Sequence, residues 1–258
     1  MSDFSEYHLS KDGSSTLYST KFQQFYHNPN GALSESKLVF YETSGLVDDL
    51  DSGIDSLSIF EVGFGTGLNF LLLLDLYLSK HLSYPIHFYS VEAFPISQKS
   101  ASKLNYCDFF EHKEFDEVLP NIFKELKPGE NIFKPFPSSE VTLHLFYSSF
   151  SDIQSIDHPI DFIFHDAFSP EVNQELWSVS TFQKLSSFCK QDAVLTTYCA
   201  ASKARAAMSK AGWFVRRAPG ALGKREMTIA SLDKKKCSHL KRINEQRLIE
   251  RWDAGEFE

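Results

Sequence analysis

The apolar and polar positions of the chain form alternating blocks, which predict strands and helices in turn. Five buried strands are predicted by short apolar runs at residues 57–62, 86–91, 141–146, 160–164 and 193–198. Helices are predicted by longer stretches at residues 68–81, 95–104, 174–189 and 202–211. Two last strands can pair as a hairpin around the turn from Gly220 to Gly223, at residues 213–216 and 226–230.

This order of elements predicts an α/β fold with an open, mostly parallel sheet of seven strands, helices on both faces and a C-terminal antiparallel hairpin. In the first 50 residues, the turn at Asn28-Pro29-Asn30-Gly31 and an apolar run at 38–41 predict an extra hairpin. Residues 106–138 are predicted to form a helix and a loop. We therefore divide the chain into an N-terminal extension packed on the core (1–50), a main domain (51–232) and a basic tail (233–258).

Three glycines at alternate positions follow the first core strand, in the segment Glu61-Val62-Gly63-Phe64-Gly65-Thr66-Gly67-Leu68-Asn69. A buried strand, a tight glycine turn and a helix can hold a nucleotide-like cofactor at the mouth of a parallel sheet. The G-x-G-x-G spacing differs from the G-x-G-x-x-G of dinucleotide binders, and no Gly-Lys-Ser/Thr follows as in a P-loop. S-adenosylmethionine agrees best, because it has no phosphate and carries positive charge that Glu61 can serve.

Polar residues also stand at the ends of later strands, where open α/β sheets bind their ligands. Glu92 ends the second strand, where an acid takes the ribose hydroxyls of an adenosine, and Asp166 ends the fourth, facing the reactive methyl group. Ser149, after the third strand, is a candidate for the adenine contact. Alone, Glu92 could complement a helix dipole and Asp166 could cap a turn. Together with the glycine loop they predict a class I, Rossmann-like methyltransferase domain.

The composition is that of an ordinary globular protein. With 258 residues, 42% of them hydrophobic and 23% charged, the chain can bury one substantial core. No apolar run reaches membrane-spanning length, the first residues lack signal-peptide features, and four distant cysteines predict reduced thiols in a cytoplasmic protein. The nine histidines show no metal spacing, so no metal is expected, and His165 is more simply structural. A serine hydrolase is excluded because the sequence has no G-x-S-x-G elbow.

The net charge of −8 argues against nucleic acid as a partner, but the charge is unevenly distributed. From Lys203 to Arg251 the chain holds 14 lysines and arginines against 4 aspartates and glutamates, whereas the remainder holds 12 against 30. A segment this basic can bind phosphate groups, or it can be the solvated surface of helices. Charge alone leaves both interpretations open.

The glycine loop resembles that of the MnmC-type methyltransferases, which act on 5-aminomethyl-(2-thio)uridine at the wobble position of tRNA. Three further segments are similar to that family's F-E-K-F-P, D-G-F-A-P and G-R-K-R-E-M motifs, namely Val91-Glu92-Ala93-Phe94-Pro95, Asp166-Ala167-Phe168-Ser169-Pro170 and Gly223-Lys224-Arg225-Glu226-Met227. The resemblance covers residues 12–230, including Phe25-Tyr26 to Gly31, with Ser148-Ser149 in place of a Gly-Asp pair. No FAD-binding oxidase half accompanies it, so methyl transfer alone is implied.

The resemblance implies N-methylation of the substrate amine, with S-adenosylmethionine as cofactor and the anticodon stem-loop of tRNA as partner. Asp166 and Phe168 would be catalytic: Asp166 would orient the amine and relay its proton, while Phe168 and Trp177 would flank an extruded base unless they pack in the core. The expected cofactor contacts are Glu61, Gly63, Phe64, Gly65, Gly67, Asn69, Glu92, Ser149 and Asp166. The expected tRNA contacts are Arg205, Arg216, Arg217, Lys224 and Arg225. A cytoplasmic monomer is favoured, without membrane or metal.

Three other interpretations compete with this one. A methyltransferase of the same fold could act on a small molecule or a protein, which agrees with the acidic remainder of the chain. A non-catalytic RNA- or partner-binding domain is disfavoured by the intact Glu61, Glu92 and Asp166. A dinucleotide-dependent oxidoreductase is disfavoured by the glycine spacing.

Overall fold

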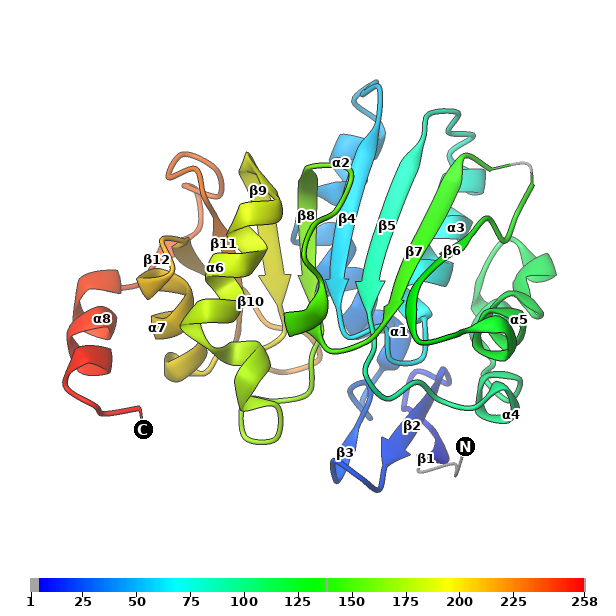
Figure 1. Ribbon diagram of the computed structural model, residues 1–258, viewed down its shortest axis with the longest axis horizontal. Coiled ribbons are helices and arrows are strands. Elements are labelled where there is room, and N and C mark those ends of the chain that lie inside the picture. The colour runs from blue at the N-terminus through cyan, green and yellow to red at the C-terminus, as the bar shows by residue number, and fades with distance from the viewer. Residues whose placement is uncertain (1–4, 138, 258) are drawn as a thin grey trace.

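A single large sheet organises the chain in the computed structural model, which describes residues 5–137 and 139–257 (Figure 1). Residues 1–4 of the predicted N-terminal extension and residue 258 of the predicted tail lie outside the described residues. The strands run in the order β12-β10-β11-β9-β8-β4-β5-β7-β6. Their bounds are β4 Leu57–Val62, β5 Ile86–Val91, β6 Gly129–Phe133, β7 Val141–Tyr147, β8 Ile160–His165, β9 Cys189–Thr197, β10 Phe214–Pro219, β11 Glu226–Ser231 and β12 Lys241–Arg242.

The five central strands, from β7 to β9, are parallel, and the outer strands pair antiparallel. All six residues of β4 are buried, as expected of a parallel strand covered on both faces. Ile59 of β4 pairs with Phe88 of β5 on one side and Phe162 of β8 on the other. The predicted α/β fold is confirmed. The sheet has nine strands rather than seven because the short strands β6 and β12 extend its two edges.

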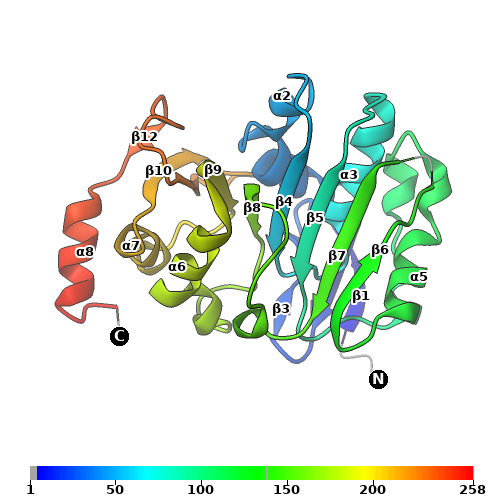
Figure 2. The same cartoon turned by 45° about the horizontal axis from the view of Figure 1, so that its top comes forward.

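Helices cover both faces of the sheet and create two hydrophobic cores. Ile59 faces the core that contains α3, whereas its neighbour Phe60 faces the core that contains α6 and α7. The helix α8 packs beside α7 at the far edge (Figure 2). The helices of the main domain and tail are α3 Leu68–Ser79, α4 Gln98–Ala101, α5 Val118–Glu125, α6 Val179–Phe188, α7 Ser202–Lys210 and α8 Glu245–Asp253.

The first 50 residues differ from the prediction. A small antiparallel sheet comes first, but the apolar run at 38–41 lies in a π-helix, Lys37–Glu42, and not in a strand. Val39, Phe40 and Tyr41 are consecutive and all buried, which suits a wide helical turn held against the core. Phe40 packs on Phe164 of β8 with 5.2 Å between ring centroids. The elements are β1 Ser5–Leu9, β2 Ser15–Ser19, β3 Gln24–Phe25, α1 Ala32–Ser36 and α2 Leu46–Leu50.

The extent of two further helices was predicted wrongly, and one strand was not predicted. The predicted helix 95–104 is only the short α4, which Ser97 caps by accepting a hydrogen bond from the Ser100 N–H. The predicted helix 174–189 is divided into a 3-10 helix and α6, because Ser178 caps α6. The strand β6 was missed because it is a mostly exposed edge strand without an apolar run. No helix among the described residues is both long and apolar enough to cross a membrane.

Candidate cofactor and substrate site

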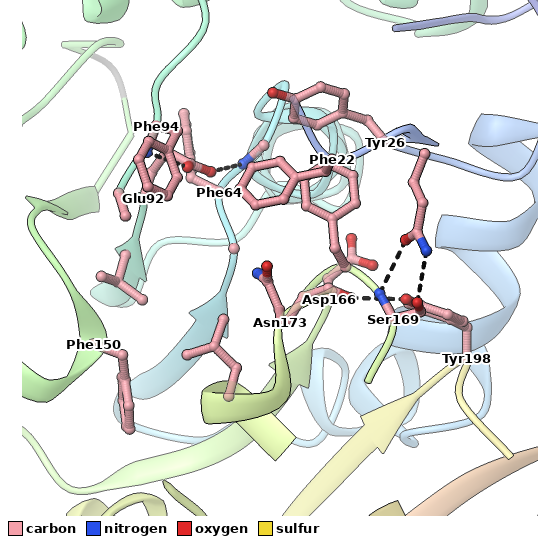
Figure 3. A pocket seen from close by; sticks show the side chains of 18 of the residues that line it. Phe22, Tyr26, Phe64, Glu92, Phe94, Phe150, Asp166, Ser169, Asn173 and Tyr198 are labelled. Atoms are coloured by element: carbon pink, nitrogen blue, oxygen red, sulfur yellow. Dashed lines mark hydrogen bonds between the residues drawn. The ribbon is translucent and has the colours of Figure 1, made fainter. Parts of the chain in front are cut away.

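A cavity of about 970 Å³ opens at the carboxyl ends of the central strands (Figure 3). The glycine loop, the end of β5, the loop after β7 and the segment after β8 line it from the main domain. Ser149, the candidate for an adenine contact, lies in this lining at the end of β7. The parallel order of β4, β5, β7 and β8 is what brings these chain segments to one edge of the sheet.

Glycine is required at two positions of the loop, for different reasons. Gly63 has φ +94°, and a Cβ there would lie 3.0 Å from the carbonyl oxygen of Asp166, so the loop passes β8 closely at the cavity wall. Gly67 has φ +81°, and a Cβ there would lie 2.3 Å from Leu119. Gly67 does not line the cavity. Gly67 therefore has a packing role and does not make the predicted cofactor contact. Gly63, Phe64 and Gly65 do line the cavity.

Glu92 is held in place by the backbone of the site. One carboxylate oxygen accepts a hydrogen bond from the Gly65 N–H at 2.9 Å, and the other accepts one from the Phe94 N–H at 2.8 Å (Figure 3). Both bonds leave further acceptor positions on the two oxygens. A fixed carboxylate of this kind in a cavity wall suits the two hydroxyls of a ribose.

Asn69 links two carboxylates at the base of the cavity. Its Nδ2 donates to Glu61 Oε1 at 2.9 Å and to Asp166 Oδ2 at 3.1 Å, and Ser90 Oγ donates to Glu61 Oε2 at 2.7 Å. Glu61 is 1% exposed and does not line the cavity, so the prediction that it meets a ligand's charge directly is wrong. It lies behind Asn69 and orients it. Burial raises the pKa of Glu61 to about 8.

Asp166 lies in the cavity wall just after β8. Burial raises the pKa of this carboxyl group well above its usual value, and the charges of Glu61 and Glu35 add to the effect. The hydrogen bond from Asn69 and the charge of Lys224 oppose it. An acid whose pKa is raised in a cleft is a candidate for proton transfer.

Aromatic rings line the same cavity as Asp166. Phe168 lies 4.8 Å from Phe22 and 5.0 Å from Tyr26, measured between ring centroids, and all three line the cavity. Figure 3 shows Phe22 and Tyr26 side by side above Asp166. Trp177 is instead a core residue at 1% exposure, and its Nε1 donates to the Phe168 carbonyl at 2.8 Å. The core-packing interpretation therefore holds for Trp177. It also holds for His165, which is buried and bonds to the Leu176 carbonyl.

The N-terminal segment supplies one wall of the cavity, which the sequence patterns did not predict. Gln24 forms two hydrogen bonds with Ser169, and Tyr18, residues 22–29 and Glu35 also line the cavity. The sequence did contain one indication of this wall, because the segment from Phe25-Tyr26 to Gly31 was part of the family resemblance. Nothing in its composition distinguished a site wall from a surface hairpin.

Two of the predicted tRNA contacts are wrong. Arg205 is 5% exposed and bonds to Thr228, Glu226 and the Met227 carbonyl, so it clamps α7 to β11. Arg216 is 2% exposed and pairs with Glu245 of α8 at 3.1 Å. Neither guanidinium can reach a phosphate without breaking these contacts.

The other three cationic residues line a second, shallower cavity of about 560 Å³. Arg217 pairs with Glu226 at 2.9 Å, Lys224 is exposed and pairs with Glu35, and Arg225 is exposed. This cavity shares Ser169, Tyr198 and Lys224 with the larger one, so the two adjoin. No group of three or more His, Cys, Asp or Glu side chains arranged for a metal occurs in the described part of the chain.

The fold and the site together define a class of protein. A Rossmann-like sheet with a glycine loop and carboxylates at successive strand ends is the site of a class I methyltransferase. Residues 111–233 match the family model described as S-adenosyl-L-methionine-dependent methyltransferase. In structure, MnmC2 from Aquifex aeolicus is similar with a TM-score of 0.72, over 96% of this chain and 75% of that one. At 20% sequence identity that similarity shows the fold.

Similar curated proteins identify the family within this class. The bifunctional tRNA 5-methylaminomethyl-2-thiouridine biosynthesis protein MnmC of Leptospira borgpetersenii is 35% identical over 215 residues, 82% of this chain and 33% of that protein. MnmC of Cupriavidus metallidurans is 31% identical over 228 residues, 86% of this chain and 33% of that protein. The chain belongs to the MnmC-type S-adenosylmethionine-dependent methyltransferases, as its motifs predicted. It spans about a third of the length of these relatives.

The cavity agrees with S-adenosylmethionine, the cofactor of this family. Gly63 and Gly65 line the cavity without side chains, and a Cβ at Gly65 would lie 3.2 Å from the Tyr26 ring. Glu92 offers its carboxylate for a ribose. Asn69 and Asp166 line the same cavity. Lys184 and Lys224 are the only lysines or arginines among the described residues of the lining, which suits a cofactor without phosphate.

Proposed function

We propose that this chain transfers a methyl group from S-adenosylmethionine to the amine of 5-aminomethyl-(2-thio)uridine at the wobble position of tRNA. Its relatives are named for the biosynthesis of 5-methylaminomethyl-2-thiouridine in tRNA. The observation that carries the proposal is Asp166, a carboxyl group at the end of the glycine-loop cavity beside the aromatic rings of Phe22, Tyr26 and Phe168. A cytoplasmic monomer is part of the same proposal.

Asp166 prepares the nucleophile. The cofactor supplies an electrophilic methyl group, so the substrate nitrogen needs a free lone pair directed at it. A primary alkylamine is mostly protonated at neutral pH, and its proton has to leave first. The raised pKa of Asp166 makes its carboxylate a stronger proton acceptor than an ordinary aspartate, and the fixed Asn69 holds that carboxylate in position. Glu61 contributes by fixing Asn69.

The rest of the site binds the nucleic acid. Phe168, Phe22 and Tyr26 provide faces on which an extruded base can stack, as bases of single-stranded loops do on aromatic side chains. Arg225, Arg217 and Lys224 line the adjoining second cavity and can contact the flanking phosphates. Glu92, the glycine loop and Ser149 would hold the adenosine part of the cofactor.

The test is a methylation assay on tRNA that carries the aminomethyl nucleoside, read by mass spectrometry of the wobble nucleosides. The wild type should add one methyl group. Asp166→Ala should abolish turnover while S-adenosylmethionine affinity, measured by calorimetry, changes less than about twofold. Asp157→Ala, an exposed carboxylate just before β8, is the control and should stay active. Methylation of a metabolite or protein panel with no reaction on tRNA would overturn the proposal.

A further inference from the structure

A second carboxylate, Glu35, reaches the same cavity from α1 of the N-terminal segment. It is 8% exposed, and its Oε1 accepts hydrogen bonds from Lys224 Nζ at 2.7 Å and from Asn28 Nδ2 at 3.1 Å. Asn28, Glu35 and Lys224 all line the cavity that contains Asp166. Both bonds to Glu35 use one oxygen, so its Oε2 is available to a further donor.

The charges at this end of the cavity do not balance. Glu35 and Lys224 lie close enough to Asp166 to act on it electrostatically. Lys224 also lies over the Tyr198 ring, 4.9 Å from its centroid. Two carboxyl groups therefore face a single ammonium group. The surplus is a potential negative charge, which a cationic ligand would neutralise.

An unsatisfied acceptor points to the same kind of ligand. Asn69 is 2% exposed and lines this cavity, and its Oδ1 has no hydrogen-bond partner among the described residues. Its Nδ2 is directed at Glu61 and Asp166, and exchanging the two atoms would place an oxygen against two carboxyl groups. A buried acceptor without a donor is costly unless a ligand supplies one. An alkylammonium group supplies three N–H donors and a positive charge.

We propose that Glu35 is a substrate-binding residue that accepts an N–H of the substrate's primary ammonium group, in the same cavity as Asp166. Lys224 and Asn28 hold the Glu35 carboxylate in orientation. The inference rests on the proposed function, because it assigns the amine of the aminomethyl group to this end of the cavity. In the proton transfer, an N–H bond breaks, its electron pair stays on nitrogen, and the proton forms an O–H bond on Asp166. Glu35 keeps its contact while this happens.

The experiment compares two anticodon stem-loop RNAs that differ only in the amine. One carries 5-aminomethyluridine and the other uridine at the wobble position, and their dissociation constants are measured with wild type and Glu35→Gln. Glutamine keeps the length and an acceptor oxygen but removes the charge. The variant should bind the aminomethyl RNA about tenfold more weakly and the uridine RNA equally well, because a charge-assisted hydrogen bond is lost. In turnover, KM for the aminomethyl RNA should rise more than kcat falls.

Lys224→Met serves as the second variant, since it leaves the Glu35 charge in place. It can weaken both RNAs, but the preference for the aminomethyl RNA should be kept or increased. Equal weakening of both RNAs by Glu35→Gln would show that Glu35 only connects α1 to the β10–β11 turn, and would overturn the inference. An unchanged preference in Glu35→Gln would also overturn it. If the wild type methylates neither the aminomethyl RNA nor tRNA, the proposed function itself fails, whatever the binding data for Glu35.

Discussion

Gln24 and Ser169 are joined by two hydrogen bonds, although they lie 145 residues apart. Gln24 Nε2 donates to Ser169 Oγ at 2.6 Å, and the Ser169 N–H donates to Gln24 Oε1 at 3.1 Å. The pair connects the N-terminal wall of the cavity to the segment that carries Asp166 and Phe168. Ser169 is therefore positioned from outside the main domain.

Gln24→Ala should lower the rate of methyl transfer about tenfold, because two partly buried hydrogen bonds that fix the Asp166–Pro170 segment are lost. Cofactor affinity should change little, since Gln24 bonds to Ser169, whereas Glu92 is held by the Gly65 and Phe94 N–H groups. Gln24→Glu keeps the acceptor for the Ser169 N–H and should have intermediate activity. Single-turnover kinetics and calorimetry measure the two effects. A wild-type rate for Gln24→Ala would remove this contact from the working site.

Gly63→Ala should impair both stability and cofactor binding, whereas Gly212→Ala should impair stability alone. Both glycines have φ +94°, so alanine at either should cost about 1–2 kcal/mol of folding free energy. At Gly212 no described atom lies within 4 Å of the added Cβ, but at Gly63 the Asp166 carbonyl lies at 3.0 Å. Denaturant unfolding and calorimetry separate the two terms. Equal cofactor affinity in both variants would contradict a close loop–cofactor approach at Gly63.

Glu92→Ala should weaken S-adenosylmethionine binding by roughly 10–100-fold, as expected when charge-assisted hydrogen bonds to a ribose are lost. Glu92→Gln retains one acceptor oxygen and should fall between the wild type and alanine. The measurement is calorimetric titration with the cofactor at constant pH. An alanine variant with wild-type affinity would show that Glu92 serves only the Gly65 and Phe94 N–H groups.

Ionisation of the buried Glu61 should lower the free energy of unfolding as the pH rises. Its pKa is raised to about 8 in the folded state from an ordinary value of 4.5, so the folded state binds the extra proton between these two values. This contribution to stability is fully present below about pH 4.5 and is lost as the pH rises through about 8. Glu61→Gln, which cannot ionise, should gain stability relative to the wild type from pH 5 to 8. Denaturant unfolding at several pH values tests this, and a constant difference would count against it.

Arg225→Ala should weaken tRNA binding several-fold and reduce the slope of log affinity against log salt by about one, because one phosphate contact is lost. Lys127→Ala is the control, because Lys127 is an exposed cation just before β6, at the opposite edge of the sheet from β10 and β11. Filter binding across a range of salt concentrations gives both numbers. The same slope in both variants would place the RNA elsewhere.

Burial on both faces made the central strands predictable. The bounds of β4 and β5 were predicted to the residue, because parallel strands covered on two sides are mostly apolar along their whole length. The parallel topology then placed Glu92 and Asp166 at one edge. The edge strand β6 carries no such run, and Leu38–Tyr41 is as apolar in a buried π-helix as in a strand.

The parts of the site that escaped prediction depend on partners distant in sequence. Arg205 and Arg216 have the same side chain as Arg225. Only the structure shows that Arg205 is paired with Glu226 and that Arg216 is paired with Glu245. Nothing in the sequence distinguished Glu35 from the other acidic residues, and only the fold brings it beside Lys224. Glu61 ended a strand, as predicted, but the side chain of Asn69 separates it from the cavity.

The bond between Glu35 and Lys224 spans 189 residues, and it closes a cavity whose other walls come from the middle of the chain. A nascent chain that has left the ribosome only as far as β9 can have the glycine loop, Glu92 and Asp166 in place, but not this end of the site. Assembly of the substrate end is therefore a late event in synthesis.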